Sequence, residues 1–120
     1  MINFSEHKPS ILIMTEQGKI DNQWNQVLWG IEEEGIPFQI KQANSEYSIE
    51  ENAYEAAHQS ALAVGIACSN NEIVIHYKNL QQQQPLFRTS SSATTKPEQL
   101  RNLGSNAARL VKGIPFKINE

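Results

Sequence analysis

The first forty residues change from a strand pattern to a helix pattern. The apolar run at residues 11–14 is short and is soon followed by Gly18, which predicts a buried strand. After residue 20 apolar side chains recur at intervals of three and four, which predicts a helix with one buried face formed by Trp24, Val27, Leu28 and Ile31. Asp21 or Asn22 can cap the start of this helix, and Gly35 offers its C-terminal cap.

The middle of the chain continues the alternation. Residues 38–41 alternate between apolar and polar side chains and predict a second strand. The capping-box sequence at residues 48–51 predicts a second helix, whose Ala-rich stretch at 53–61 gives it a face of small side chains. Apolar runs at 62–67 and 72–77, separated by a tight turn, predict a third and a fourth strand that form an antiparallel hairpin.

The last third predicts an edge strand and a long helix. Residues 85–88 predict a fifth strand at the edge of the sheet, because the proline at its start suits an edge. Thr95 and Glu98 are spaced as a capping pair for a final helix, which Gly113 ends. The apolar stripe of this helix consists of Leu100, Leu103, Ala107, Leu110 and Val111. The order of elements predicts one α/β domain over residues 1–120, with a mostly parallel sheet and one antiparallel strand.

Size and charge narrow the class of protein. A chain of 120 residues is long enough for one hydrophobic core and too short for two. Ten Lys and Arg residues stand against thirteen Asp and Glu residues, which gives a net charge of −3. The sequence has no basic stripe, whereas binding to nucleic-acid phosphates normally needs one. We therefore expect no nucleic-acid partner.

The cysteine content and the lengths of the apolar runs indicate the cellular compartment of the protein. Cys68 is the single cysteine, so the chain has neither an intrachain disulfide nor a Cys-rich zinc site. Residues 1–6 lack the features of a signal peptide, and no apolar run approaches the roughly 20 residues that span a bilayer. We expect a soluble, cytosolic protein with no membrane partner.

Candidate catalytic groups are scattered along the sequence. The histidines His7, His58 and His76 lack the spacing of a metal-binding pair, and Cys68 follows a buried strand, which favours a structural thiol. The sequence has neither a Gly-rich phosphate loop with its Lys-Ser/Thr pair nor a Gly-x-Ser-x-Gly motif. We therefore predict no catalytic residues and no cofactor site within the chain itself.

Two features near the end of the first predicted helix each have two possible interpretations from the sequence alone. Glu32, Glu33 and Glu34 carry negative charge at a helix C-terminus, where the macrodipole disfavours it. They are either a solvated helix end or a place where one carboxylate binds an external cation, a metal or a partner's arginine. Trp29 lies off the centre of the apolar stripe, so it either widens the core face or marks a partner surface.

Three segments carry a family resemblance. They are residues 27–37, VLWGIEEEGIP; residues 64–66 together with 71–76; and residues 100–112, LRNLGSNAARLVK. In this order the chain resembles the small (beta) subunit of the diol/glycerol dehydratase reactivating factor, a member of the B12-dependent dehydratase-associated subunit family. The resemblance implies a three-layer α/β/α sandwich with a five-stranded mixed sheet whose fourth strand is antiparallel, similar to anticodon-binding domains. The medium subunit of the coenzyme-B12-dependent dehydratase shares this fold.

The resemblance also implies a function without catalysis by this chain. The family's reactivating factor is a chaperone-like heterotetramer of two large and two small subunits, in which the large subunit binds and hydrolyses ATP. The small subunit is displaced so that the large one can bind the dehydratase where its medium subunit sat. Damaged cobalamin then leaves and intact adenosylcobalamin enters. ATP and cobalamin would reach this chain only through its partners, in the cytoplasm, whether free or enclosed in a bacterial microcompartment.

Glu33 matches the family glutamate that reaches a magnesium ion held by the large subunit. The resemblance thus implies a metal ligand in trans at Glu33, with Trp29, Glu32 and Glu34 at the same interface. The apolar residues Val111, Ile114 and Phe116 near the C-terminus are a further candidate partner surface. Two rival functions remain: a medium subunit of the dehydratase itself, and a small-molecule enzyme on a flavodoxin-like sheet, which only fold analogy supports.

Overall fold

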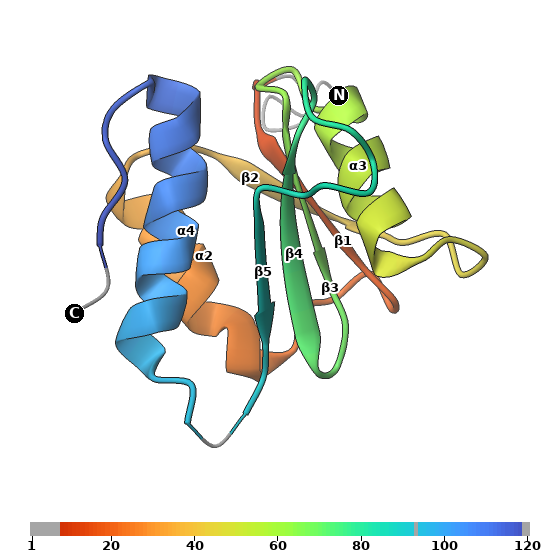
Figure 1. Ribbon diagram of the computed structural model, residues 1–120, viewed down its shortest axis with the longest axis horizontal. Helices are drawn as coiled ribbons and strands as arrows, with labels where there is room; N and C mark the ends of the chain where they lie inside the picture. The colour runs from red at the N-terminus through yellow and green to blue at the C-terminus, as the bar shows by residue number, and fades with distance from the viewer. Residues whose placement is uncertain (1–7, 93, 119–120) are drawn as a thin grey trace, which may run out of the picture.

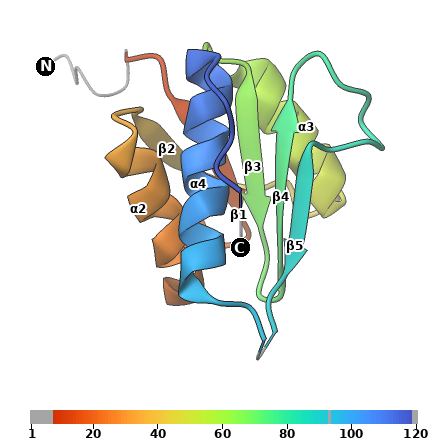
Figure 2. The ribbon, with the colours of Figure 1, turned by 60° about the vertical axis from the view of Figure 1, so that its left-hand side comes forward.

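The protein folds as three layers with a mixed sheet in the middle (Figures 1 and 2). The computed structural model describes residues 8–92 and 94–118. In this part of the chain the strands are β1 (Ile11–Thr15), β2 (Phe38–Gln42), β3 (Val64–Cys68), β4 (Glu72–Tyr77) and β5 (Phe87–Ser90). The helices are the 3₁₀ turn η1 (Asn22–Trp24), α2 (Asn25–Glu33), α3 (Ile49–Gln59) and α4 (Pro97–Lys112). Helices α2 and α4 cover one face of the sheet, and α3 covers the other.

The sheet has the order β2-β1-β3-β4-β5. β1 pairs in parallel with both β2 and β3, while β4 runs antiparallel to its neighbours β3 and β5. The antiparallel hairpin of β3 and β4 is closed by the Ser69 N–H, which donates to the Glu72 carbonyl oxygen over 2.8 Å. The predicted fold class, including its one antiparallel strand, is confirmed.

Successive side chains of β1 point to opposite faces of the sheet and contribute to the core on each face. Ile11 and Ile13 pack with the buried side chains of α2 and α4, whereas Leu12 and Met14 pack with Ala53 of α3. All five residues of β1 are buried, as expected for a central strand that is covered on both faces. The small side chains predicted for the second helix thus lie against the sheet.

Two glycines let the helices α2 and α4 approach closely. A Cβ built on Gly30 of α2 would lie 2.7 Å from the backbone nitrogen of Ser105 and closer still to the carbonyl oxygen of Arg101. A Cβ on Gly104 of α4 would lie 2.7 Å from the carbonyl carbon of Val27. No side chain fits at either position, so the backbones of α2 and α4 touch. This contact determines how the end of α2 faces α4.

Most helix ends are as predicted. The Asp21 carboxylate accepts from the Gln23 N–H over 3.2 Å, although it caps a 3₁₀ turn that leads into α2 rather than α2 directly. The capping box of α3 is present, with Glu51 N–H donating to the Ser48 hydroxyl over 3.1 Å. Gly35 and Gly113 both have positive φ, which ends α2 and α4 in the left-handed conformation that glycine favours.

Three predicted boundaries are wrong. The start of α4 is capped by Gln99, whose Oε1 accepts from the Lys96 N–H over 3.0 Å, while the Thr95 hydroxyl donates instead to the Ser90 carbonyl. The fifth strand starts at Phe87 rather than at residue 85. The third strand starts at Val64, because the preceding residue, Ala63, has a positive φ of 64° that no strand accommodates.

Candidate functional site

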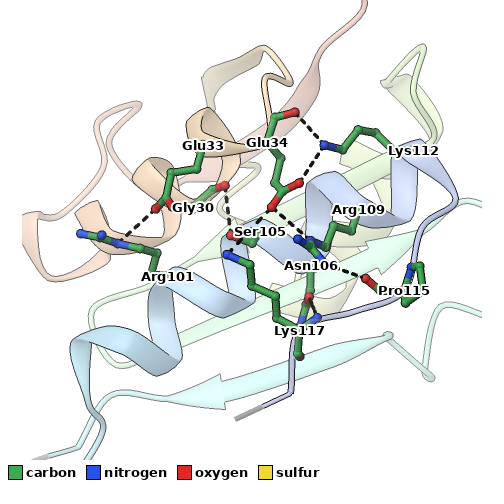
Figure 3. A network of polar contacts seen from close by, with 10 residues as sticks. All are labelled: Gly30, Glu33, Glu34, Arg101, Ser105, Asn106, Arg109, Lys112, Pro115 and Lys117. Atoms are coloured by element: carbon green, nitrogen blue, oxygen red, sulfur yellow. Dashed lines mark hydrogen bonds and ion pairs between the residues drawn. The ribbon is translucent and has the colours of Figure 1, made fainter.

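Glu33 and Glu34, two of the three consecutive glutamates at the end of α2, point in different directions (Figure 3). Successive side chains on a helix are about 100° apart, since 3.6 residues make one turn. Glu34, the C-cap residue, turns towards α4. Glu32 and Glu33 are exposed. The same residue type therefore has two different environments within three positions.

Glu34 is enclosed by cations of its own chain. Its Oε1 lies 2.7 Å from Lys112 Nζ, and its Oε2 lies 3.1 Å from Arg109 Nε and 3.9 Å from Lys117 Nζ. Only 9% of the side chain is exposed. The hydrogen bond from Lys112 is the largest cause of a lowered pKa of Glu34; the hydrogen bond and charge of Arg109 also lower it, although burial opposes the shift. Glu34 thus joins α2 to the end of α4 through ion pairs of its own chain.

Glu33 keeps its carboxylate at the surface. Its side chain is 46% exposed, and its Oε1 lies 3.4 Å from Arg101 Nε. An exposed pair of this kind is weak, since both charges remain hydrated. Among the described residues Glu32 forms no ion pair. Glu32 and Glu33 are therefore the carboxylates that can bind an external cation.

Trp29 lies at the surface next to Glu33. It is 45% exposed, so it does not widen the core face. The Arg101 guanidinium lies 5.7 Å from the centroid of its ring, within the range of a cation–π contact. Arg101 Nε also donates to Gln26 Oε1 over 2.9 Å. An aromatic ring, a guanidinium and a carboxylate thus form one exposed cluster on α2 and α4.

The C-terminal segment beyond α4 folds back onto the domain. The Asn106 side chain binds the backbone of Lys117 twice, by accepting from its N–H over 2.6 Å and donating to its carbonyl over 3.0 Å. The Phe116 ring contacts the Phe87 ring of β5 edge-on, with 5.4 Å between centroids. Ile114 and Phe116 stay partly exposed, while Val111 packs against the core. The predicted apolar surface is therefore partly packed against the domain and partly exposed to solvent.

The two histidines in the described residues contact backbone groups within the fold. His76 is fully buried; its Nδ1 accepts from the Tyr77 N–H over 3.0 Å, and its Nε2 donates to the Gln82 carbonyl over 3.2 Å. His58 Nδ1 lies 3.0 Å from the carbonyl oxygen of Tyr54 one turn earlier. His7 lies outside the described residues. Within residues 8–92 and 94–118, no three His, Cys, Asp or Glu side chains gather as a metal site.

Two hollows of about 360 and 420 Å³ lie at the carboxyl ends of β1 and β3. This is the place where open α/β sheets bind ligands, so it bears on the rival enzyme function. Cys68 lines both hollows, and burial raises the pKa of its thiol to about 12. A buried thiol that stays protonated at neutral pH is a poor nucleophile, which agrees with the structural role predicted for Cys68.

Sequence reasoning missed the partners of the glutamates. Arg101, Arg109 and Lys112 come from α4, between 68 and 78 positions further along the chain than the glutamates they meet. Two signals were present: the glycines at 30 and 104, which permit close contact, and basic residues spaced along one side of the last helix. Together they could have indicated that the last helix crosses the acidic end of the first.

No helix in the described residues is long and apolar enough to cross a membrane. The longest of them, α4, has 16 residues.

The family model for the dehydratase medium subunit matches residues 8–117. The chain therefore belongs to the dehydratase medium subunit family.

Within this family the chain is similar to small subunits of reactivating factors. It is 44% identical to the propanediol dehydratase-reactivating factor small subunit of Salmonella typhimurium, over 94% of this chain and 95% of that protein. It is 45% identical to the diol dehydratase-reactivating factor small subunit of Klebsiella michiganensis, over 97% of this chain and 90% of that protein. The resemblance seen in the sequence is confirmed.

Solved structures agree with the sequence relatives. The fold matches a chain of the diol dehydratase-reactivating factor complexed with ADP and Mg²⁺, with a TM-score of 0.83, 44% identity and coverage of 92% of this chain and 99% of that chain. It also matches glycerol dehydratase reactivase with a TM-score of 0.82, 30% identity and coverage of 92% and 98%.

Proposed function

We propose that the chain is the small, non-catalytic subunit of a reactivating factor that serves a coenzyme-B12-dependent diol or glycerol dehydratase. The observation that carries this proposal is the 44–45% identity to reactivating-factor small subunits across at least 90% of both chains. The partner we propose is the large subunit, in a heterotetramer of two large and two small subunits in the cytoplasm. The names of the relatives favour this function over that of the dehydratase's own medium subunit.

The proposed mechanism is reversible association. The large subunit hydrolyses ATP; the small subunit leaves it, and the large subunit then binds the dehydratase where the medium subunit sat. Damaged cobalamin departs and intact adenosylcobalamin enters. A subunit that must leave its partner needs an interface of modest area with exchangeable polar contacts. The exposed cluster of Trp29, Glu33 and Arg101 has this character, because its charges are already hydrated in the free chain.

We further propose that Glu33 supplies one carboxylate oxygen to a magnesium ion held by the large subunit, with Trp29 and Glu32 beside it at the interface. Magnesium is a hard cation that takes oxygen ligands, and an exposed carboxylate with a weak counter-ion fits this demand. Glu34 fits it poorly, since three cations of its own chain already hold its carboxylate. We assign Glu34 a supporting role behind the interface. The similar reactivating factor was solved with ADP and Mg²⁺.

Reconstitution tests this function. An inactivated dehydratase is incubated with ATP, magnesium and adenosylcobalamin, together with the large subunit alone, this chain alone, or both. We expect dehydratase activity to return only when the assembled factor is supplied. The proposal is contradicted if this chain replaces the medium subunit in a stable, active dehydratase, because that result would identify it as a dehydratase subunit.

A further inference from the structure

Arg101 is in contact with three residues of one face of α2. Its Nε donates to Gln26 Oε1 over 2.9 Å and lies 3.4 Å from Glu33 Oε1, and its guanidinium lies 5.7 Å from the centroid of the Trp29 ring. Positions 26, 29 and 33 are spaced by three and four residues, so they follow one line along the helix. The arginine of α4 therefore lies along that line, with Glu33 at its end.

Glu33 cannot keep this arginine and bind a divalent cation at the same oxygen. A second positive charge at Oε1 would stand beside the guanidinium, and like charges at such a distance repel. One of them has to move away. The hydrogen bond to Gln26 and the contact with Trp29 give the arginine a place to remain when the carboxylate leaves it.

We propose that Arg101 is a positioning residue, which holds the Glu33 carboxylate in the free chain and releases it to the divalent cation when the large subunit is bound. This inference rests on the proposed function. By competing with the cation, Arg101 raises the magnesium concentration that association requires. It also keeps Glu33 oriented and neutralised while the subunit is alone.

The Arg101–Glu33 pair is exposed and weak enough for a cation to replace the arginine at the carboxylate. The side chain of Arg101 is 43% exposed and that of Glu33 is 46% exposed, so water replaces either partner at little cost. The separation of 3.4 Å is longer than the 2.7–2.9 Å typical of a strong charged hydrogen bond. Glu34 is the contrasting case: it is buried among three cations and has no such freedom.

A magnesium titration of complex formation tests the proposal. The full chain and its Arg101→Gln variant are each titrated against the large subunit at increasing magnesium concentration. An exposed ion pair changes an equilibrium by about 1.5- to 5-fold, so we expect the midpoint for Arg101→Gln to fall by about that factor. Arg101→Lys keeps a positive charge next to Glu33, and its midpoint should lie closer to that of the unmodified chain.

Arg88→Gln is the matched control. Arg88 is also partly exposed and pairs with two carboxylates, those of Glu50 and Glu72, so removing it tests a general loss of surface charge. Its midpoint should not change. An Arg101→Gln midpoint that is unchanged or raised overturns the proposal, as does an equal shift for Arg88→Gln. If Arg101→Gln reduces folded protein, Arg101→Met, which keeps a long unbranched side chain without the charge, is titrated under the same criteria.

The Glu33→Gln background separates this inference from the proposed function. If Glu33→Gln leaves the magnesium dependence unchanged, the metal role of Glu33 fails and the competition proposed for Arg101 fails with it. If Glu33→Gln abolishes the dependence while Arg101→Gln has no effect in the unmodified chain, only the role of Arg101 fails. We expect Arg101→Gln to lower the midpoint in the unmodified chain and to leave complex formation unchanged in the Glu33→Gln background.

Discussion

Gly30 faces the carbonyl oxygen of Arg101 so closely that no side chain fits between the two backbones. The Ser105 hydroxyl strengthens the contact by donating to the Gly30 carbonyl oxygen over 3.3 Å. Three residues after Gly30 comes Glu33, and one position further comes Glu34. The close contact between α2 and α4 therefore determines which glutamate is enclosed by basic residues of α4 and which remains at the surface.

Gly30→Ala should be strongly destabilising. The added methyl group would overlap backbone atoms of α4, which cannot turn away as a side chain can, so we expect a loss of about 1–3 kcal/mol in the free energy of unfolding. Chemical denaturation measures it. Gly35→Asn is the control, because Gly35 has open space around it and asparagine tolerates its positive φ. Equal stability for Gly30→Ala and the unmodified chain would contradict the close packing.

Glu34→Gln should cost stability in a pH-dependent way. The pKa of Glu34 is lowered in the folded state, so ionisation stabilises the fold above the ordinary value of 4.5. This contribution is lost as the pH falls from 4.5 through the lowered folded-state pKa. We expect a loss of about 1–2 kcal/mol at pH 7 that shrinks below pH 4.5, measured by denaturation at several pH values. Glu32→Gln should show neither effect; a loss for Glu34→Gln that is constant down to pH 2 would argue against this ion pairing.

The isolated chain should neither hydrolyse ATP nor bind cobalamin tightly. The sequence contains no phosphate-binding loop, and the thiol at the carboxyl ends of β1 and β3 is buried and protonated. Phosphate release and equilibrium dialysis measure the two activities. Robust turnover by pure chain, free of the large subunit, would overturn the non-catalytic assignment.

Truncation after Lys112 should affect both association and stability. It removes Phe116 from Phe87 and the backbone of Lys117 from Asn106, so we expect a loss of about 1–3 kcal/mol in the free energy of unfolding. The circular dichroism spectrum should keep its native shape, because α4 itself is retained. Co-purification with the large subunit should weaken as Ile114 and Phe116 are lost. Full retention of binding would exclude this segment from the interface.

The periodic elements could be predicted from the sequence because their signals are local. Apolar spacing marked β1 and α2, and the capping residues of α3 lay within four positions of one another. The N-cap of α4 was misplaced because Thr95 and Glu98 match the same local pattern that Lys96 and Gln99 use in the structure. The choice between the two depends on where the preceding loop runs, which a local pattern does not contain.

The different roles of the glutamates could not be predicted in this way. Glu32, Glu33 and Glu34 are identical in type and adjacent in sequence, so only contacts with α4 distinguish them. Those contacts depend on the close approach at Gly30 and Gly104. The resemblance of residues 27–37 to the family predicted Glu33 as the metal ligand, which stays a prediction; the structure shows that the carboxylate of Glu33 is exposed, while that of Glu34 is enclosed.

In the function we propose, Glu33 gives a carboxylate oxygen to a cation across the subunit interface. Glu33→Gln keeps the shape of the side chain and removes the charge that a hard cation favours. The free chain should lose little stability, because its pair with Arg101 is exposed.

The most direct test is a binding titration of the unmodified chain, Glu33→Gln and Glu32→Gln against the large subunit, first with magnesium and then with a chelator. We expect Glu33→Gln to weaken the complex by about 1–3 kcal/mol in magnesium, and the difference to vanish in chelator. Glu32→Gln should bind like the unmodified chain in both. Equal affinity of Glu33→Gln and the unmodified chain in magnesium would contradict the claim.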